Sequence, residues 1–275
     1  MQEVTLNNGS TVPQLGFGVW QVEDDHAYSA VTTAFEAGYR HIDTARIYEN
    51  ETGVGRAIRD SGLPRGEVFL TTKLWNSDQG YDAALTAFDA SLDRLGTDYV
   101  DLYLIHWPTP EHDRYVDTWR ALEKIYADGR AKAIGVSNFT EATLKRLVDE
   151  TDIVPVLNQI ELHPYFQQRE MRSVAGSLGI ATEAWSPLGQ GGALLSEPVL
   201  ARLAEQYGKT PAQIVLRWHL QIGNIVIPKS VTPSRISENI DVFDFALSEA
   251  DLALIDDLDN PGGRIGPNPD TFNLA

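Results

Sequence analysis

The feature that most constrains the fold of this chain is a regular alternation of short, apolar, β-rich runs with amphipathic helical stretches. This alternation is typical of βαβ units around a parallel sheet. Eight strand candidates can be counted, and eight parallel strands close a (β/α)8 TIM barrel of the α/β class. The candidates are residues 15–20, 41–45, 68–75, 100–107, 131–138, 156–162, 181–187 and 224–230.

The segments between these runs carry helical signals. Apolar residues recur at helical spacing and stop at a glycine in two clear sets, which are Leu85, Phe88, Leu92 and Leu95 before Gly96, and Val116, Trp119, Leu122 and Tyr126 before Gly129. Thr210-Pro211-x-Gln213 resembles a capping box with proline at the first helical position. Ser248-x-x-Asp251 predicts the start of the last helix in the same way.

The chain of 275 residues shows no linker-like composition shift and no low-complexity stretch. Barrels of this kind use about 250 residues as one unit, so we expect a single domain over residues 1–275. The Gly- and Pro-rich segment from Pro261 to Ala275 predicts a loop, which makes the part after about residue 259 a C-terminal tail.

Composition excludes several classes of protein. There is no cysteine, so disulfides, iron–sulfur clusters, thiolate zinc sites and a cysteine nucleophile are ruled out. The net charge of −17 disfavours nucleic acid and anionic lipid as partners. No apolar run is long enough to span a membrane and the N-terminus lacks a signal-peptide pattern, so we expect a cytoplasmic protein.

Function in such a barrel sits at the carboxyl ends of the strands, where four polar residues draw attention. Asp43 closes the second run, Lys73 lies near the end of the third, His106 ends the fourth, and Tyr48 follows the second in a loop. Strand alternation predicts that Lys73 points inward and is buried. A buried lysine needs a partner, and Asp43 on the adjacent strand is suitable. A structural ion pair without a catalytic role would produce the same pattern.

The tyrosine favours chemistry at this position. A free phenol has a pKa of about 10, and a nearby ammonium favours the phenolate. At about 4 Å and an effective dielectric of about 20, the attraction between Lys73 and the Tyr48 phenolate is roughly 4 kcal/mol, which Asp43 would partly offset. We therefore expect a lowered pKa for Tyr48. With His106 as a second donor to a substrate oxygen, the four residues predict carbonyl chemistry.

At this point the sequence is recognisable. The segments GYRHIDTARIYENETGVGRAI, TTKLWN, DLYLIHWP, IGVSNF, NQIELHPY, WSPLGQG and IPKS…RISEN resemble the aldo-keto reductases, in order and over nearly the whole chain. EAWSPLGQGG and KTPAQIVLRWHLQ look most like the bacterial 2,5-diketo-D-gluconate reductase branch. The resemblance implies metal-free reduction of an aldehyde or ketone by NADPH, with Asp43, Tyr48, Lys73 and His106 as the catalytic residues. It implies that Tyr48 donates the proton.

The resemblance also implies a cofactor site. Ser137, Asn138 and Gln159 match the residues that hold the nicotinamide carboxamide, and Trp185 matches the aromatic residue that stacks on the ring, which is tyrosine in most members. The loop containing Ser186, Leu188, Gly189 and Gln190 would line the pyrophosphate. The residues that match the 2′-phosphate site are Lys229, Ser230, Val231 and Arg235. Glu238 and Asn239 would contact the adenine end. Thr232 stands where similar members have arginine, which bears on the preference for NADPH over NADH.

The tryptophans Trp20, Trp75 and Trp107 each end a strand candidate. Core packing would explain them, but the resemblance favours an apolar wall around a small carbonyl substrate, together with Tyr48 and His106. His41 and His219 are expected to pack in the interior, His26 and His112 to be exposed, and His163 to hold a turn. No histidine pattern predicts a metal site.

Other readings of the sequence remain. Gly53-Val54-Gly55 lacks the preceding strand and the third small residue of a dinucleotide fingerprint. A glycosidase would need paired carboxylates, for which Glu161 and Glu183 are candidates. An NADPH-binding redox sensor with little turnover would use the same fold. The physiological substrate is left open, and the family resemblance implies a monomer.

Overall fold

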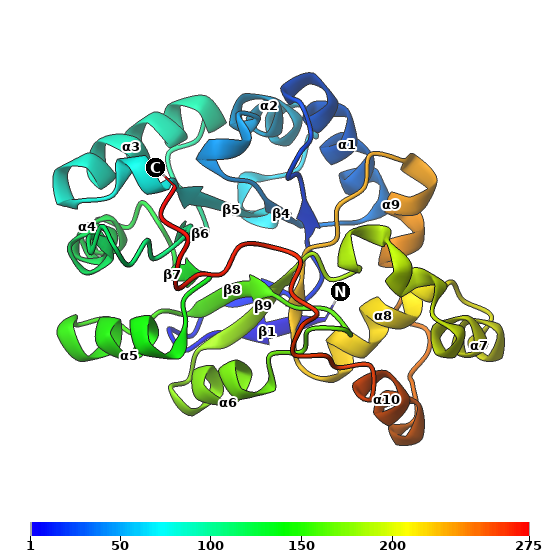
Figure 1. Ribbon diagram of the computed structural model, residues 1–275. Helices are drawn as coiled ribbons and strands as arrows, with labels where there is room; N and C mark the ends of the chain where they lie inside the picture. The colour runs from blue at the N-terminus through cyan, green and yellow to red at the C-terminus, as the bar shows by residue number, and fades with distance from the viewer. Residues whose placement is uncertain (1, 275) are drawn as a thin grey trace.

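The computed structural model describes residues 2–274 and shows a parallel eight-stranded sheet curved into a barrel with helices around it (Figure 1). Neighbouring strands follow chain order from β3 to β10, as in a (β/α)8 barrel. The strands are β3 (Phe17–Gly18), β4 (His41–Asp43), β5 (Phe69–Leu74), β6 (Leu102–Ile105), β7 (Ile134–Ser137), β8 (Leu157–Glu161), β9 (Ala181–Trp185) and β10 (Ile225–Val226). The eight expected strands are thus confirmed, each within its predicted range.

The edge strands meet and close the barrel. A parallel bridge joins Leu15 to Val226, and the amide of Gly16 donates to the carbonyl of Val226. The amide of Gly18 donates to the carbonyl of Pro228 on the same edge. Because the barrel closes, no strand of the sheet is left with an unpaired edge.

The helices form the outer layer and agree with the capping signals. Their bounds are α1 (Asp24–Ala37), α2 (Glu51–Asp60), α3 (Tyr81–Leu95), α4 (Tyr115–Ala127), α5 (Glu141–Glu150), α6 (Arg169–Ser177), α7 (Pro198–Tyr207), α8 (Pro211–Gln221), α9 (Pro233–Ile240) and α10 (Glu249–Asp256). Thr210 and Gln213 make the predicted capping box, and Ser248 accepts from the amide of Asp251. Gly96 ends α3 in the left-handed conformation that favours glycine.

Short 3-10 turns occur in the loops. They are η1 (Arg46–Tyr48), η2 (Arg65–Glu67), η3 (Asn76–Asp78), η4 (Gly189–Gly191) and η5 (Ala193–Ser196). An antiparallel hairpin of β1 (Glu3–Thr5) and β2 (Thr11–Pro13) precedes the barrel, and sequence reasoning missed it. Its strands have only three residues each, too short for a clear alternation of apolar and polar side chains.

The glycines of the Gly53-Val54-Gly55 sequence pack helix α2 and do not form a phosphate loop. A Cβ at Gly53 would lie 2.1 Å from the carbonyl oxygen of Asp24, and one at Gly55 would lie 2.1 Å from that of Leu95. Only glycine therefore lets α2 approach these backbones. The structure agrees with setting the dinucleotide fingerprint aside.

The C-terminal tail contains no helix or strand between residues 261 and 274, as expected, and Ala275 lies outside the described residues. It runs across the mouth of the barrel, in red in Figure 1, from α10 toward α3. Its far end is fixed by Asn76, whose Nδ2 donates to the carbonyl of Leu274, and by Trp107, whose ring packs at a tilt against Phe272. In residues 2–274 no helix is both long and apolar enough to cross a bilayer.

Candidate active site

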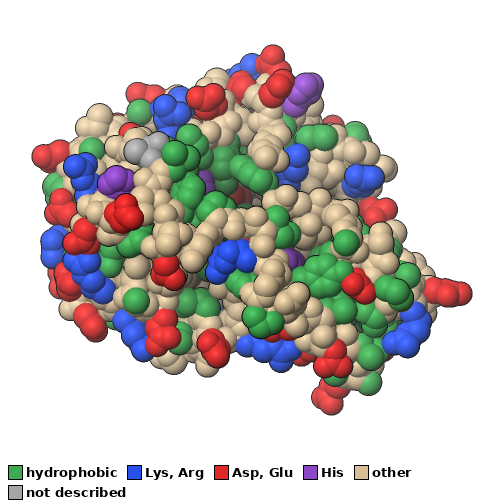
Figure 2. Space-filling model, viewed as in Figure 1, with side chains coloured by type: hydrophobic (Ala, Val, Ile, Leu, Met, Phe, Trp, Pro, Cys, Tyr) green, Lys and Arg blue, Asp and Glu red, His purple; other side chains and the backbone are tan. Residues whose placement is uncertain are grey.

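The four catalytic candidates meet at the carboxyl ends of neighbouring strands. Asp43 is the last residue of β4, Lys73 is next to last in β5, and His106 directly follows β6. Tyr48 ends the 3-10 turn η1 that follows β4. Figure 2, which looks into this end, shows a hollow bordered mainly by hydrophobic side chains beside the tail. Barrel geometry thus places all four at one mouth.

Lys73 is fully buried and forms the expected ion pair. Its Nζ lies 2.5 Å from Asp43 Oδ1, donates to the carbonyl of Thr44 at 3.0 Å, and lies 3.5 Å from Tyr48 Oη. Burial by itself lowers the pKa of Lys73, but the Asp43 carboxylate, through its charge and its hydrogen bond, raises the pKa above its ordinary value, with further contributions from Tyr48 and Glu183. Lys73 is therefore a fixed positive charge under the tyrosine hydroxyl.

The pKa of Tyr48 corrects the sequence-based expectation. Burial raises the pKa of this phenol more than Lys73 lowers it, and Asp43 raises it further, so the pKa lies above its ordinary value. The expectation of a lowered pKa counted the attraction of Lys73 but not the loss of water around a phenolate. At neutral pH Tyr48 therefore carries its proton and can donate it.

His106 faces Tyr48 across the mouth. The two ring centroids are 5.7 Å apart, and Trp75 packs edge-to-face on His106 at 5.3 Å. Burial, with a smaller effect of Lys73, holds the pKa of His106 well below its ordinary value. The ring is thus neutral at pH 7 and keeps one N–H donor. Among the described residues its Nδ1 has no hydrogen-bond partner.

Gln159 links the ion pair to a second buried carboxylate. Its Nε2 donates to Asp43 Oδ2 at 2.8 Å and to Glu183 Oε2 at 2.9 Å. Burial and, to a lesser extent, Asp43 raise the pKa of Glu183 to about 8, and its Oε1 lies 3.6 Å from Nε2 of His41. Sequence reasoning missed Thr44 and Glu183 in this network, although the alternation of β9 puts Glu183 on the same face as Trp185.

The residues expected to hold a nicotinamide lie together on β7, β8 and β9. Asn138 has a left-handed backbone, and its Nδ2 donates to the carbonyl of His106 and to Ser137 Oγ. The indole Nε1 of Trp185 donates to Asn138 Oδ1 at 2.8 Å. A carbonyl oxygen has a second lone pair, so Oδ1 can still accept from a carboxamide. This link requires an indole N–H, which the tyrosine of most members does not have.

The remaining cofactor candidates lie in the loop after β9 and in the segment that leads from Lys229 into helix α9. Ser186 and Gln190 have left-handed backbones around the turn η4, close to Leu188 and Gly189. Lys229, Val231 and Arg235 are exposed at the start of α9, whose N-cap Thr232 makes no side-chain capping bond. Ser230 accepts from the amide of Thr232, Glu238 accepts from Thr210 Oγ1, and Asn239 is buried.

The three tryptophans line the mouth to different degrees. Trp20 is 42% exposed, Trp75 is half-buried, and Trp107 is covered by Phe272 of the tail. Among the histidines, His41 and His219 are buried and His26 and His112 are exposed, as predicted. His163, which was expected to hold a turn, is buried and exchanges backbone hydrogen bonds with Phe166.

The glycosidase reading is wrong for this structure. Glu161 accepts from His163 and from two amides of the tail, and Glu183 is enclosed in the barrel interior. Glu161 borders only a cavity of about 100 Å3, and Glu183 is fully buried, so the two carboxylates do not face a common open site that could hold a sugar. No group of three or more His, Asp or Glu residues within the described chain is arranged to hold a metal ion.

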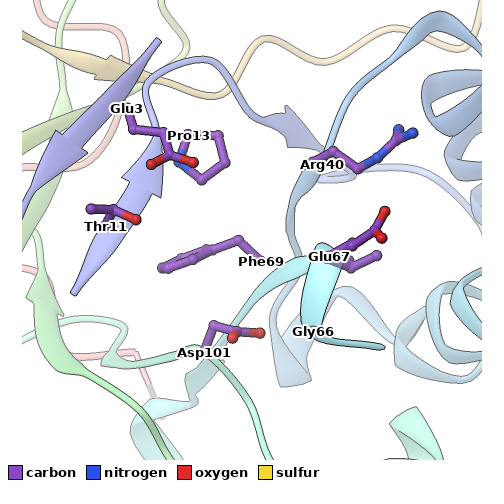
Figure 3. A pocket seen from close by; sticks show the side chains of 9 residues that line it. Glu3, Thr11, Pro13, Arg40, Gly66, Glu67, Phe69 and Asp101 are labelled. Carbon is purple, nitrogen blue, oxygen red and sulfur yellow. The ribbon is translucent and has the colours of Figure 1, made fainter. Parts of the chain in front are cut away.

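A cavity of about 430 Å3 lies at the opposite end of the barrel (Figure 3). Glu3, Thr11 and Pro13 of the hairpin lie on one side of it, and Arg40 and Glu67 on the other. It lacks the lysine, tyrosine and histidine of the mouth. Because the reactive groups lie at the carboxyl ends of the strands, we place the site there rather than in the larger cavity.

The sequence and the fold were compared with those of known proteins. Residues 14–260 match the model of the Aldo/keto reductase family. The chain is 60% identical to an aldo-keto reductase of Mycolicibacterium smegmatis, covering 99% of this chain and 98% of that protein. It is 50% identical to the methylglyoxal reductase DkgA of Escherichia coli strain K12, covering 98% and 97%. A crystal structure of a Gox0644 mutant in complex with NADPH is 48% identical over 99% of each chain, with a TM-score of 0.96.

The closed eight-stranded barrel, the quartet at its mouth and the match over most of the length lead to one conclusion: the chain belongs to the aldo/keto reductase family.

Proposed function

We propose that this protein uses NADPH to reduce a small aldehyde or ketone, with Tyr48 as proton donor, and that its substrates include small dicarbonyls such as methylglyoxal or 2,5-diketo-D-gluconate. The observation that carries the proposal is the Lys73–Asp43 ion pair placed 3.5 Å below the Tyr48 hydroxyl, opposite His106. The named methylglyoxal reductase at 50% identity supports the substrate class.

The residues present fit a phosphorylated nicotinamide cofactor. In a chain of net charge −17, Lys229 and Arg235 are exposed cations that form no ion pair with any described residue. They flank the N-terminus of α9, where amides and the helix dipole favour an anion. Gln159 has committed its Nε2 to two carboxylates, so its Oε1 is the atom left for a carboxamide N–H.

When bound, NADPH supplies the hydride that the carbonyl carbon receives. Tyr48 gives its proton to the carbonyl oxygen, and the Lys73 ammonium stabilises the phenolate that remains. Asp43 holds that ammonium in place. Neutral His106 offers its N–H to the same oxygen and orients the substrate. Lys73 thus acts mainly on charge that develops during the reaction, which agrees with a phenol that is protonated at rest.

The test is NADPH oxidation against a panel containing 2,5-diketo-D-gluconate, methylglyoxal and simple aromatic aldehydes, with NADH in parallel. Tyr48→Phe is expected to lower kcat by about 10²–10⁴-fold, the usual contribution of a positioned general acid, and to leave NADPH affinity nearly intact. Tyr81→Phe, at an exposed position on α3, is the matched control.

Two results would contradict this proposal. A tenfold or larger loss of NADPH affinity in Tyr48→Phe would remove Tyr48 from its role at the substrate oxygen. Tight NADPH binding with no turnover on the panel would favour the redox-sensor function. The monomeric state and the cytoplasmic location stay predictions from the sequence, and sedimentation would check the first.

A further inference from the structure

The C-terminal tail is attached to the barrel through one buried carboxylate. Glu161, the last residue of β8, is 1% exposed. Its Oε1 accepts from the amide of Ile265 at 2.5 Å and contacts His163 Nε2 at 3.1 Å, while its Oε2 accepts from the amide of Gly266 at 2.8 Å. Burial raises the pKa of Glu161, but these hydrogen bonds together lower it by more than burial raises it. The pKa therefore lies below its ordinary value, and the carboxylate is ionised at neutral pH. The tail is therefore held by a fixed negative charge.

This attachment presses the tail backbone against Trp185. A Cβ at Gly266 would lie 2.5 Å from Trp185 Cη2 and 2.9 Å from Glu161 Oε2. Glu161 and Trp185 are direct partners in the register of β8 and β9. Gly266 thus lies in contact with both the Glu161 carboxylate and the Trp185 indole, and there is no space for a side chain at this position.

Trp185 in turn holds a cofactor candidate. Its Nε1 donates to Asn138 Oδ1 at 2.8 Å, and Asn138 Nδ2 donates to the carbonyl of His106 at 3.0 Å. Continuous contacts therefore run from the middle of the tail to the end of the strand that carries the catalytic histidine.

We propose that Glu161 is a positioning residue for the nicotinamide. It fixes the tail so that Gly266 supports the indole of Trp185, and the indole N–H fixes the side chain of Asn138. This rests on the proposed function, in which the nicotinamide binds against Trp185 and Asn138. On this proposal, the middle of the tail contributes to the affinity for NADPH, in addition to any contact that the tail makes with the substrate.

The middle of the tail also contacts the loop after β8, where Gly263 packs against the carbonyl of Tyr165 and Arg264 lies over the Phe166 ring at 4.6 Å. Among the described residues, however, the Glu161 carboxylate is the group that hydrogen-bonds to the two tail amides beside Trp185. Described residues 261–274 form no helix or strand, and the anchors at Asn76 and Trp107 lie at the far end. A cavity of about 100 Å3 lies beneath the tail, lined in part by Asn138, Glu161 and Arg264. Loss of the charge at Glu161 would leave this part of the tail room to shift.

The first test is Glu161→Gln, which removes the charge and turns an N–H toward the tail amides. We expect the Kd for NADPH, measured by quenching of tryptophan fluorescence, to rise about tenfold, or about 1.4 kcal/mol. Glu123→Gln is the matched control, because Glu123 Oε1 also accepts from two consecutive amides, Asp152 and Ile153, on the outside of the barrel.

A second variant keeps the carboxylate and disturbs its target. Gly266→Ala places a methyl group against Trp185 and should also raise the Kd for NADPH, whereas Gly262→Ala should not, since a Cβ there meets only Asn260 Oδ1 at 3.4 Å. In a Trp185→Phe background, which lacks the indole N–H, Glu161→Gln should have a smaller effect than in wild type.

The outcomes are separable. If wild type and both variants bind NADPH equally and only the KM for the carbonyl changes, the tail is a substrate wall and the inference is overturned. Wild-type protein that does not bind NADPH would instead overturn the proposed function. If Glu161→Gln does not fold, Gly266→Ala against Gly262→Ala decides the question.

Discussion

Two buried carboxylate–cation groups lie on opposite sides of strand β5. On the helix side, Glu51 is 1% exposed and accepts from Thr72 Oγ1 at 2.6 Å, Ser91 Oγ at 3.3 Å and Arg94 Nε at 2.7 Å. On the barrel side, Lys73, which follows Thr72 in β5, pairs with Asp43.

The two groups differ in what their charges face. The oxygens of Glu51 are used in fixed hydrogen bonds from neighbouring elements. Lys73 instead faces a tyrosine hydroxyl at a long 3.5 Å, and His106 beside that tyrosine keeps an unpartnered ring nitrogen. Both ion pairs satisfy their own charged groups, but the Lys73 ammonium has a tyrosine hydroxyl at the barrel mouth as one of its partners, so its field acts on a group that a ligand can reach. On the proposed function, this difference is the reason why the Lys73–Asp43 pair acts in catalysis while the Glu51–Arg94 pair is structural.

The largest expected effect comes from removing the two cations in turn. Lys73→Met should lower kcat by about 10²–10⁴-fold and destabilise the protein by about 3–5 kcal/mol, because Asp43 stays buried without its partner. Arg94→Met should destabilise by about 1–3 kcal/mol and leave the kcat per folded molecule near wild type. Chemical denaturation and NADPH oxidation measure the two quantities. Equal losses of kcat in both variants would abolish the distinction.

The same contrast applies to arginines. Arg94 is committed to Glu51, but Arg235 has no ion-pair partner among residues 2–274 and stands at the start of α9. Arg235→Ala is expected to weaken NADPH binding by about 10- to 100-fold, the range for a charge-assisted contact, with little effect on NADH. Arg202→Ala on α7 is the control for loss of an exposed arginine. Equal effects on both cofactors would remove the 2′-phosphate assignment.

The smallest expected effect concerns stability and pH. The pKa of Glu183 is about 8 in the folded protein and 4.5 in the unfolded chain, so between these values the folded state holds a proton that the unfolded state has lost. Glu183 therefore makes the protein less stable as pH rises from 4.5 through 8. Glu183→Gln should change little at about pH 5 and stabilise by about 1–3 kcal/mol at about pH 9.

Thermal unfolding at both pH values is the measurement for Glu183. Glu51→Gln serves as the opposite case, since it weakens hydrogen bonds that are in place and should lower stability at both pH values. A Glu183→Gln protein that is less stable than wild type at about pH 9 would show that the carboxylate is structural like Glu51.

The sequence predicted the eight strands, the capped helices and the meeting of Asp43, Tyr48, Lys73 and His106 at the barrel mouth, because each depends on local signals. Alternation within β5 identified Lys73 as buried, and its position near Asp43 identified the partner. The hairpin β1–β2 was not predicted, because strands of three residues are too short to show an alternation of apolar and polar side chains. The direction of the pKa shift of Tyr48 was predicted wrongly for another reason. It depends on whether burial or the charge of Lys73 has the larger effect, and burial depends on all the residues around the mouth.

By itself, then, the sequence determined the barrel, the family resemblance and the identity of the reactive groups, because strand periodicity, caps and residue chemistry are written along the chain. Only the tertiary structure decided which hydrogen-bond partners each buried carboxylate has. Glu161 and Glu183 lie near the ends of neighbouring strands in the sequence, yet one holds the tail about a hundred residues later and the other lies against Gln159 inside the barrel. Partners so distant along the chain meet only when the barrel closes, since their hydrogen bonds depend on packing rather than on local pattern.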